Sequence, residues 1–146
     1  MSDLYDRDFY AWATEQAALL RAGKVAQADV ARIAEEIETL GRSEKRELVS
    51  RLTVLLQHLL KWRFQPALRG SSWRLSIDNS RDAIVDHLAD NPSLKAQLPA
   101  AMAAAYRYAR RQAAIESGLA VTSFPSDSPW TFDEAMRDSL EPPQDQ

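Results

Sequence analysis

The stretch Ser43–Phe64, SEKRELVSRLTVLLQHLLKWRF, decides the fold. Its leucines recur at the three- and four-residue spacing of one helix face, which Val49 and Leu60 widen further: Leu48, Leu52, Leu55, Leu56 and Leu59. A helix that is apolar over so much of its circumference is typical of the centre of a bundle. Pro66 follows two residues after Phe64 and ends the predicted helix.

Helical periodicity continues on both sides of this stretch, and no segment alternates as a strand does. The pattern predicts further helices over about 5–22, 28–40, 72–90 and 93–117, the last bent or restarted at Pro99, and a short one over 132–140. Gly23 and Gly118 directly follow two of these ranges and are expected helix stops. Thr131 and Glu134 match a capping box at the start of the short helix. The sequence therefore predicts an all-α, single-domain antiparallel helical bundle over residues 1–140. It has about five main helices plus a short C-terminal helix, and residues 141–146 form a disordered tail.

The composition excludes several classes of protein. The chain has 146 residues, enough for one domain with a core of its own. It has no cysteine, which excludes disulfides and thiolate metal sites, and its four glycines exclude a Gly-rich phosphate loop. No apolar run approaches the roughly 20 residues of a membrane span, and the first residues are acidic where a secretory signal is basic. We expect a cytoplasmic protein.

The order of segments resembles a bacterial family catalogued as domain of unknown function 29. The residues that carry the resemblance run along almost the whole chain: Tyr5–Trp12, Leu20–Gly23, Ala34–Glu38, Leu40–Gly41, His58–Trp62, Gln65–Pro66, Ser72–Trp73, Asn91–Leu94, Glu116–Leu119, Pro125 and Pro129. Ser117 stands where the family usually has Thr. The resemblance implies a helical bundle, and it implies no reaction, cofactor or catalytic residue.

Basic residues concentrate between Arg42 and Arg74. This segment holds eight basic and two acidic residues, a local charge of +6 in a chain of net charge −3. Around its turn, arginines bracket tryptophans, and we take these residues as the candidate binding site: Trp62, Arg63, Arg69, Trp73 and Arg74. Such a set suits either a protein hot spot or the stacking and phosphate contacts of nucleic-acid binding. The acidic pI of about 5.4 favours the protein partner. In a third interpretation the tryptophans close the core and the arginines are solvated.

Two charged residues fall on faces that otherwise point inward. Arg81 lies in the apolar seam of the 72–90 helix, and Glu116 lies in the seam of the 93–117 helix. A buried arginine requires a carboxylate, so we predict a structural ion pair of Arg81 with Glu116, or with Glu36 or Glu38. The alternative is an arginine that holds an anionic ligand in a cleft of the bundle.

No residues stand out as catalytic, and we expect no metal and no cofactor. Glu36, His58 and Glu116 are residue types found in di-metal carboxylate bundles, but the Glu-x-x-His spacing of those sites is absent. The leading hypothesis is a non-enzymatic interaction protein that binds a protein partner or a second copy of itself, away from membranes. The alternative is nucleic-acid or polyanion binding through the Arg-rich segment 42–74. A carboxylate-metal bundle enzyme is the third.

Overall fold

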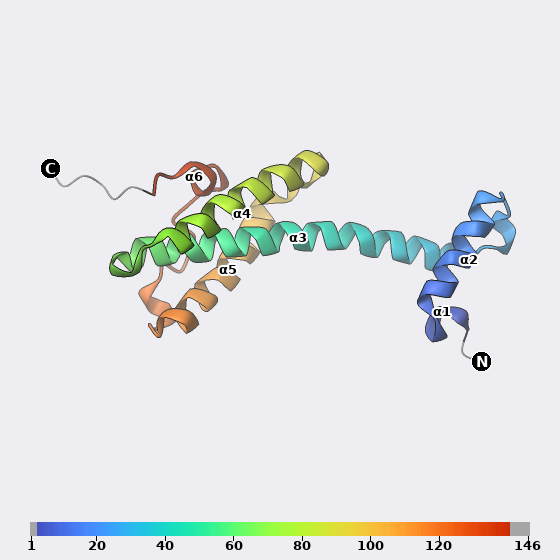
Figure 1. The fold of residues 1–146 in the computed structure, drawn as a ribbon, viewed down its shortest axis with the longest axis horizontal. Helices are drawn as coiled ribbons and strands as arrows, with labels where there is room; N and C mark the ends of the chain where they lie inside the picture. The colour runs from blue at the N-terminus through green and yellow to red at the C-terminus, as the bar shows by residue number, and fades with distance from the viewer. Residues whose placement is uncertain (1–2, 141–146) are drawn as a thin grey trace. The chain divides into compact units, whose positions relative to one another are not determined.

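The chain is built from α-helices joined by short 3-10 turns. The computed structural model describes residues 3–140, and that part of the chain contains no strand. The helices are α1 (Leu4–Arg7), α2 (Phe9–Arg21), α3 (Val30–Phe64), α4 (Ser71–Asp90), α5 (Leu98–Ser117) and α6 (Phe132–Arg137) (Figure 1). The predicted all-α fold class is confirmed. Within residues 3–140, no helix combines the length and the apolarity needed to cross a bilayer.

The helices gather into two compact units. The N-terminal unit is Met1–Ser43 and the C-terminal unit is Glu44–Gln146, so α3 contributes residues to both. The predicted disordered tail, 141–146, lies outside the described residues.

Helix α3 runs through Gly41, where the sequence predicts a break between two helices. One glycine within a helix costs only about 1 kcal/mol relative to alanine, which the flanking helix formers outweigh. Gly41 also lacks the left-handed backbone that ends helices, in contrast to Gly23 and Gly118, which both have φ of 73°. The predicted stops at Gly23 and Gly118 are therefore right and the break near Gly41 is wrong.

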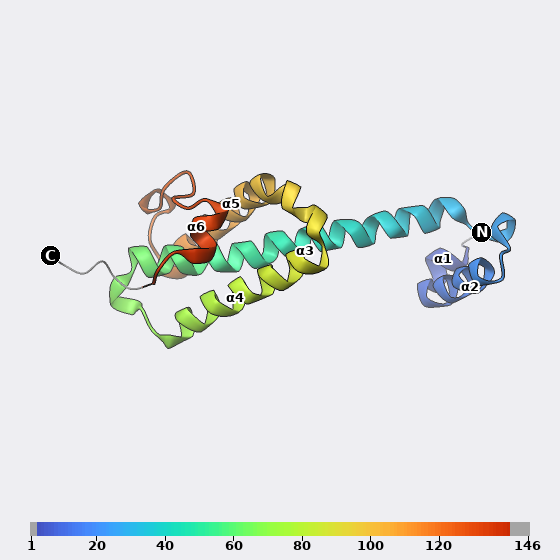
Figure 2. The same ribbon diagram turned by 90° about the horizontal axis from the view of Figure 1, so that it is seen from above.

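The core of the C-terminal unit forms around the second half of α3. Its leucines at 48, 52, 55, 56 and 60 are fully buried, as are Ile77 and Ile84 of α4. Helix α5 completes this cluster with alanines, whose small side chains allow close packing, and Figures 1 and 2 show α4 and α5 running alongside α3. The predicted central position of residues 43–64 is thus found within this unit.

The remaining helix ends follow their local signals. A 3-10 turn, Pro92–Gln97, precedes α5, so the predicted restart near Pro99 is close to the observed start at Leu98. Both hydrogen bonds of the capping box between Thr131 and Glu134 are present at α6. That helix ends at Arg137, three residues earlier than predicted.

The N-terminal unit contains α1, α2 and the first part of α3, and α2 and α3 are joined by a short turn that includes the 3-10 helix Val25–Gln27. Asp8 interrupts the predicted 5–22 helix, because its side chain accepts from the Ala11 N–H and starts α2. The Tyr5 hydroxyl donates to Glu36, and the Gln16 side chain accepts from the Asp29 N–H at 2.7 Å. These contacts tie α1 and α2 to the beginning of α3.

The continuity of α3 predicts opposite effects for two Gly→Ala substitutions. A Cβ added at Gly41 meets nothing within 4 Å, so Gly41→Ala raises the free energy of unfolding by up to about 1 kcal/mol. Gly118→Ala is the matched control. A Cβ added at Gly118 also meets nothing within 4 Å, but alanine would have to adopt a positive φ there. Gly118→Ala therefore lowers the free energy of unfolding by about 1 kcal/mol. Urea titrations of both variants measure the difference, and a destabilising Gly41→Ala would mean that α3 is broken there.

Candidate functional site

The predicted binding residues surround the end of α3, and two of them are engaged within the fold. Trp62 donates its indole Nε1–H to the carbonyl of Leu140 at 2.7 Å. Arg69 donates to the Trp62 carbonyl at 2.6 Å, and its guanidinium carbon lies 5.3 Å from the centre of the Trp62 ring. Both side chains therefore fasten the residues after α6 and the turn after α3 to the core.

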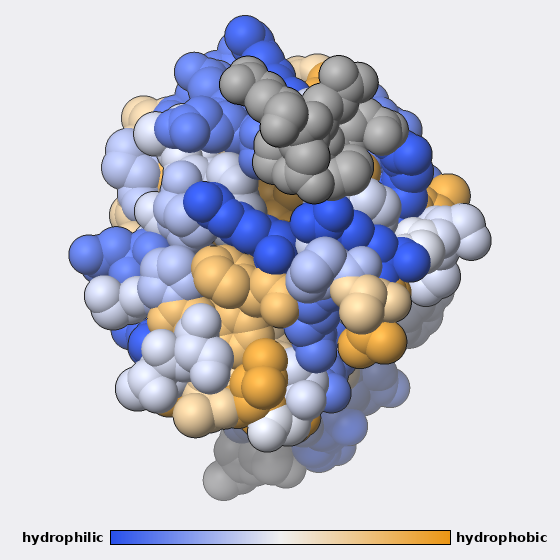
Figure 3. All heavy atoms as spheres, turned by 90° about the vertical axis from the view of Figure 1, so that its left-hand side faces the viewer, coloured by the Kyte–Doolittle hydropathy of each residue, from blue (hydrophilic) through white to orange (hydrophobic). Residues whose placement is uncertain are grey.

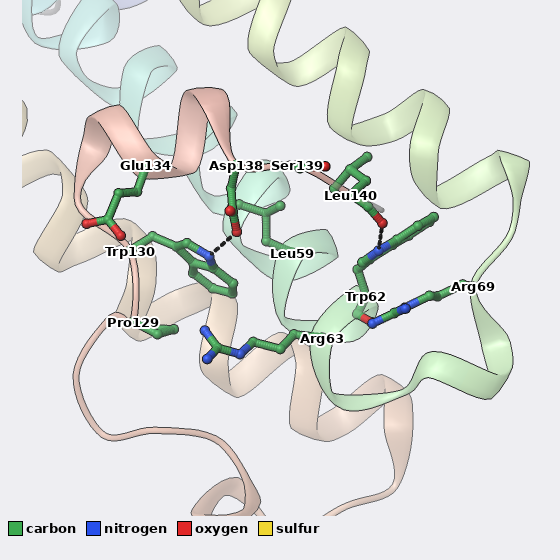
Figure 4. A pocket seen from close by; sticks show the side chains of 10 residues that line it. All are labelled: Leu59, Trp62, Arg63, Arg69, Pro129, Trp130, Glu134, Asp138, Ser139 and Leu140. Atoms are coloured by element: carbon green, nitrogen blue, oxygen red, sulfur yellow. Dashed lines mark hydrogen bonds between the residues drawn. The ribbon is translucent and has the colours of Figure 1, made fainter. Parts of the chain in front are cut away.

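Arg63 enters a pocket of about 530 Å³, which Trp62 and Arg69 also line. Its guanidinium carbon lies 5.9 Å from the ring centres of both Phe64 and Trp130, and it extends beneath Trp130 toward Pro129 (Figure 4). The carboxylates of Glu134 and Asp138 line the same pocket, and Asp138 accepts from the Trp130 indole at 3.0 Å. Two arginines and two carboxylates leave the pocket without net charge.

Trp73 and Arg74 do not line this pocket. Trp73 is half-buried in the first turn of α4, and the Lys61 ammonium lies 5.2 Å from its ring centre. Arg74 is exposed one residue later. On the face of the C-terminal unit drawn in Figure 3, hydrophilic and apolar side chains alternate and apolar ones gather in the lower half. Of the five predicted residues, Trp62, Arg63 and Arg69 therefore line this pocket, whereas Trp73 and Arg74 do not.

Several basic side chains of the Arg-rich segment 42–74 form ion pairs with carboxylates of the same chain. Arg51 donates to Glu47 at 2.8 Å, Arg42 lies 3.8 Å from Glu38, and Lys61 bonds to Glu116. Nucleic-acid affinity rests on cations that remain available to phosphates. These ion pairs reduce the number of cations available to phosphates, so they give the nucleic-acid alternative no specific support.

The predicted ion pair of Arg81 and Glu116 is replaced by other partners. Arg81 is half-buried and donates to the backbone carbonyls of Ala135 and Asp138, both at 3.0 Å, so it holds the end of α6. Glu116 accepts from Lys61 and, at 2.8 Å, from Gln57, and its side chain is 39% exposed. Glu36 accepts from Tyr5. Backbone carbonyl oxygens, like carboxylates, accept hydrogen bonds from a guanidinium, so the helix face of Arg81 alone did not identify its partner.

The residues weighed for a metal site have other contacts too. His58 bonds through Nδ1 to the Val54 carbonyl at 2.8 Å, within its own helix. Among residues 3–140, no three His, Cys, Asp or Glu side chains come together in a way that could hold a metal ion. The structure therefore gives the carboxylate-metal hypothesis no geometric support.

A second candidate surface lies in the N-terminal unit, and the sequence analysis missed it. We call it the hairpin groove. It measures about 390 Å³ and is lined by Phe9, Trp12, Ala13, Gln16, Ala17 and Leu20 of α2 and by Ile33, Glu36, Ile37 and Leu40 of α3. Ile37 is 62% exposed and Leu40 is 67% exposed, although both belong to the apolar stripe of their helix. The stripe was visible in the sequence, but a stripe does not reveal that too few helices cover it.

A family model described as domain of unknown function DUF29 matches residues 4–140. The chain belongs to this family. No curated protein and no solved structure matches the chain. The family description names no reaction, ligand or partner, so the function of this DUF29 member is argued below from its own surfaces.

The Lys61–Glu116 contact gives this DUF29 member a measurable dependence on pH. The Lys61 ammonium, helped by Gln57, holds the pKa of Glu116 below its ordinary value of 4.5, against the opposing effect of partial burial. A lowered folded-state pKa gives stability that is present above pH 4.5 and is lost as the pH falls through the folded value. Because Glu116 is partly exposed, the contribution is under about 1 kcal/mol. Glu116→Gln therefore loses stability relative to the parent at pH 7, and urea titrations show that gap closing below pH 4.5. A gap that persists at acid pH would contradict the assignment.

The separate partners of Arg81 and Glu116 predict that their substitutions are independent. Arg81→Met removes two hydrogen bonds to α6, and Glu116→Gln removes one charge contact near the end of α5. A double-mutant cycle on the free energy of unfolding gives a coupling below about 0.5 kcal/mol. A coupling free energy well above about 1 kcal/mol would instead indicate a direct ion pair between Arg81 and Glu116.

Proposed function

We propose that the protein is a non-enzymatic interaction protein and that the hairpin groove is its docking surface, occupied by the groove of a second copy. The observation that carries the proposal is the exposure of the groove's apolar residues. Phe9 is half exposed, and Ile37 and Leu40 are more exposed still, on two neighbouring helices. Contiguous exposed apolar surface that lines a groove marks interaction sites in soluble proteins.

The N-terminal unit buries too little of its own apolar surface to be complete. It spans Met1–Ser43, and Trp12 is its only buried apolar side chain among the described residues. Units of about 40 residues usually require a metal, a disulfide or association for stability. The chain has no cysteine, and association is the route that its exposed groove supports.

A second copy suits the shape of the groove. Two consecutive helices with an open apolar groove between them can pack against a second such pair to form four helices around one core, and two copies related by a two-fold axis then cover each other's grooves. Both copies then contribute the same surface to the interface, so the groove needs no other protein to cover it. Helix α2 has 13 residues and is about 20 Å long, which allows contacts along several turns.

Salt dependence separates this proposal from binding of a basic partner. The N-terminal unit has eight acidic and five basic residues, a net charge of −3, so two copies repel each other weakly. Salt screens that repulsion, and an apolar contact between copies is as strong or stronger at high salt. Binding of a basic partner helix to this acidic unit would instead weaken at high salt.

The proposal predicts a dimer that one substitution in the groove disrupts. Ile37→Glu places a charge in the seam and weakens self-association at least about a hundredfold, because the charge must be buried in the dimer. Leu75→Glu is the matched control. Leu75 is 60% exposed on α4 of the C-terminal unit, against 62% for Ile37, and its substitution leaves association unchanged.

Sedimentation equilibrium of the full chain at low and high salt measures both variants against the parent. The expected result is a parent dimer that persists at high salt and a monomeric Ile37→Glu chain with parental helicity. A parent that is monomeric throughout, or equal association in all three chains, would overturn self-association through this groove.

A further inference from the structure

A hollow of about 500 Å³ on the C-terminal unit gathers three arginines from one helix. Arg107, Arg110 and Arg111 of α5 line it together with Ala103, Tyr106, Val121 and residues 126–128 of the following loop. We call it the arginine hollow. It is separate from the hairpin groove and shares no lining residue with the pocket of Arg63.

The loop that forms the far wall is fastened to α5. Phe124 is 2% exposed and packs in the core. The Tyr106 hydroxyl donates to the Pro125 carbonyl, and the Arg110 guanidinium donates twice to the Phe124 carbonyl, at 3.2 and 3.1 Å. These hydrogen bonds hold the loop in a fixed position beside α5, and Arg110 is one of the residues that hold it.

The charge of the hollow is unbalanced. Residues 107, 110 and 111 have the spacing i, i+3 and i+4, which places their side chains on one face of the helix, where like charges destabilise it. Asp127 is the only carboxylate among the lining residues, so three positive charges meet one negative charge, a net +2. None of the three arginines has an ion pair within 4.0 Å among the described residues.

The two outer arginines are the ones available to a ligand. Arg107 and Arg111 are both exposed, and the guanidinium of Arg107 lies 5.2 Å from the ring centre of Tyr108. Ser126 is exposed, lines the same hollow and brings a hydroxyl donor to it. The Ser128 hydroxyl, in contrast, is already bonded to the backbone of Trp130.

We propose that the arginine hollow binds the phosphoryl group of a small phosphorylated ligand. Guanidinium groups form bidentate, charge-assisted hydrogen bonds to phosphate oxygens, and a dianion relieves the repulsion between neighbouring arginines. The volume exceeds that of a phosphate alone and lies within the range of small-molecule sites. Nucleic acid fits less well, because the charge is confined to one hollow in a chain of pI about 5.4 rather than spread along a stripe.

The test is isothermal titration calorimetry of the full chain with inorganic phosphate, adenosine monophosphate and a phosphoserine peptide at low salt. We expect one binding site per chain. Whichever of adenosine monophosphate and the phosphoserine peptide binds more tightly shows whether the phosphoryl group comes from a nucleotide or from a modified protein. Arg111→Gln weakens binding about tenfold, and Arg107→Gln combined with Arg111→Gln weakens it further. Arg110 is left unchanged because it holds the loop.

Arg63→Gln is the matched control, since it removes an exposed cation from the other arginine pocket and leaves binding unchanged. Circular dichroism confirms that every variant retains the parental helicity. The proposal is overturned if no probe binds at low salt, or if Arg63→Gln weakens binding as much as Arg111→Gln does. It is also overturned if a single-stranded oligonucleotide, titrated under the same conditions, binds while inorganic phosphate does not.

Discussion

An amphipathic helix is stable only where something covers its apolar face, and α3 meets this condition differently along its length. In the C-terminal unit its leucines are fully buried against α4 and α5. In the N-terminal unit the same helix has one hairpin neighbour, and Ile37 and Leu40 stay largely exposed. Because the hydrophobic effect scales with the area removed from water, the first part of α3 gains less from folding than the second. The proposed dimer follows from this difference.

Local signals in the sequence predicted most of the fold. Pro66 ended α3 as expected, Gly118 ended α5, and Thr131 with Glu134 capped α6. Each of these depends only on residues within one turn of helix, which is why the sequence alone was sufficient. Gly41 misled the prediction because glycine ends a helix only when its backbone turns left-handed, and at this position it does not.

The candidate site was less predictable, because helix phase shows which way a side chain points but not what it meets. Arg81 was correctly placed toward the inside, yet its partners are carbonyls at the end of α6. Trp62 and Arg69 were chosen as binding residues, and they hold Leu140 and the turn after α3 in place. Arg107, Arg110 and Arg111 were passed over, since their importance depends on a loop that folds back beside them. Long-range contacts of this kind leave no periodic pattern.

Amide hydrogen exchange along α3, at low and at high protein concentration, tests the central claim most directly. Exchange protection reports the free energy of local opening, residue by residue. The account predicts strong protection for residues 48–60 at any concentration, and protection of residues 30–40 that rises with concentration as the groove becomes covered. Equal and concentration-independent protection over both parts of α3 would contradict it, because the first part would then need no second copy to be stable.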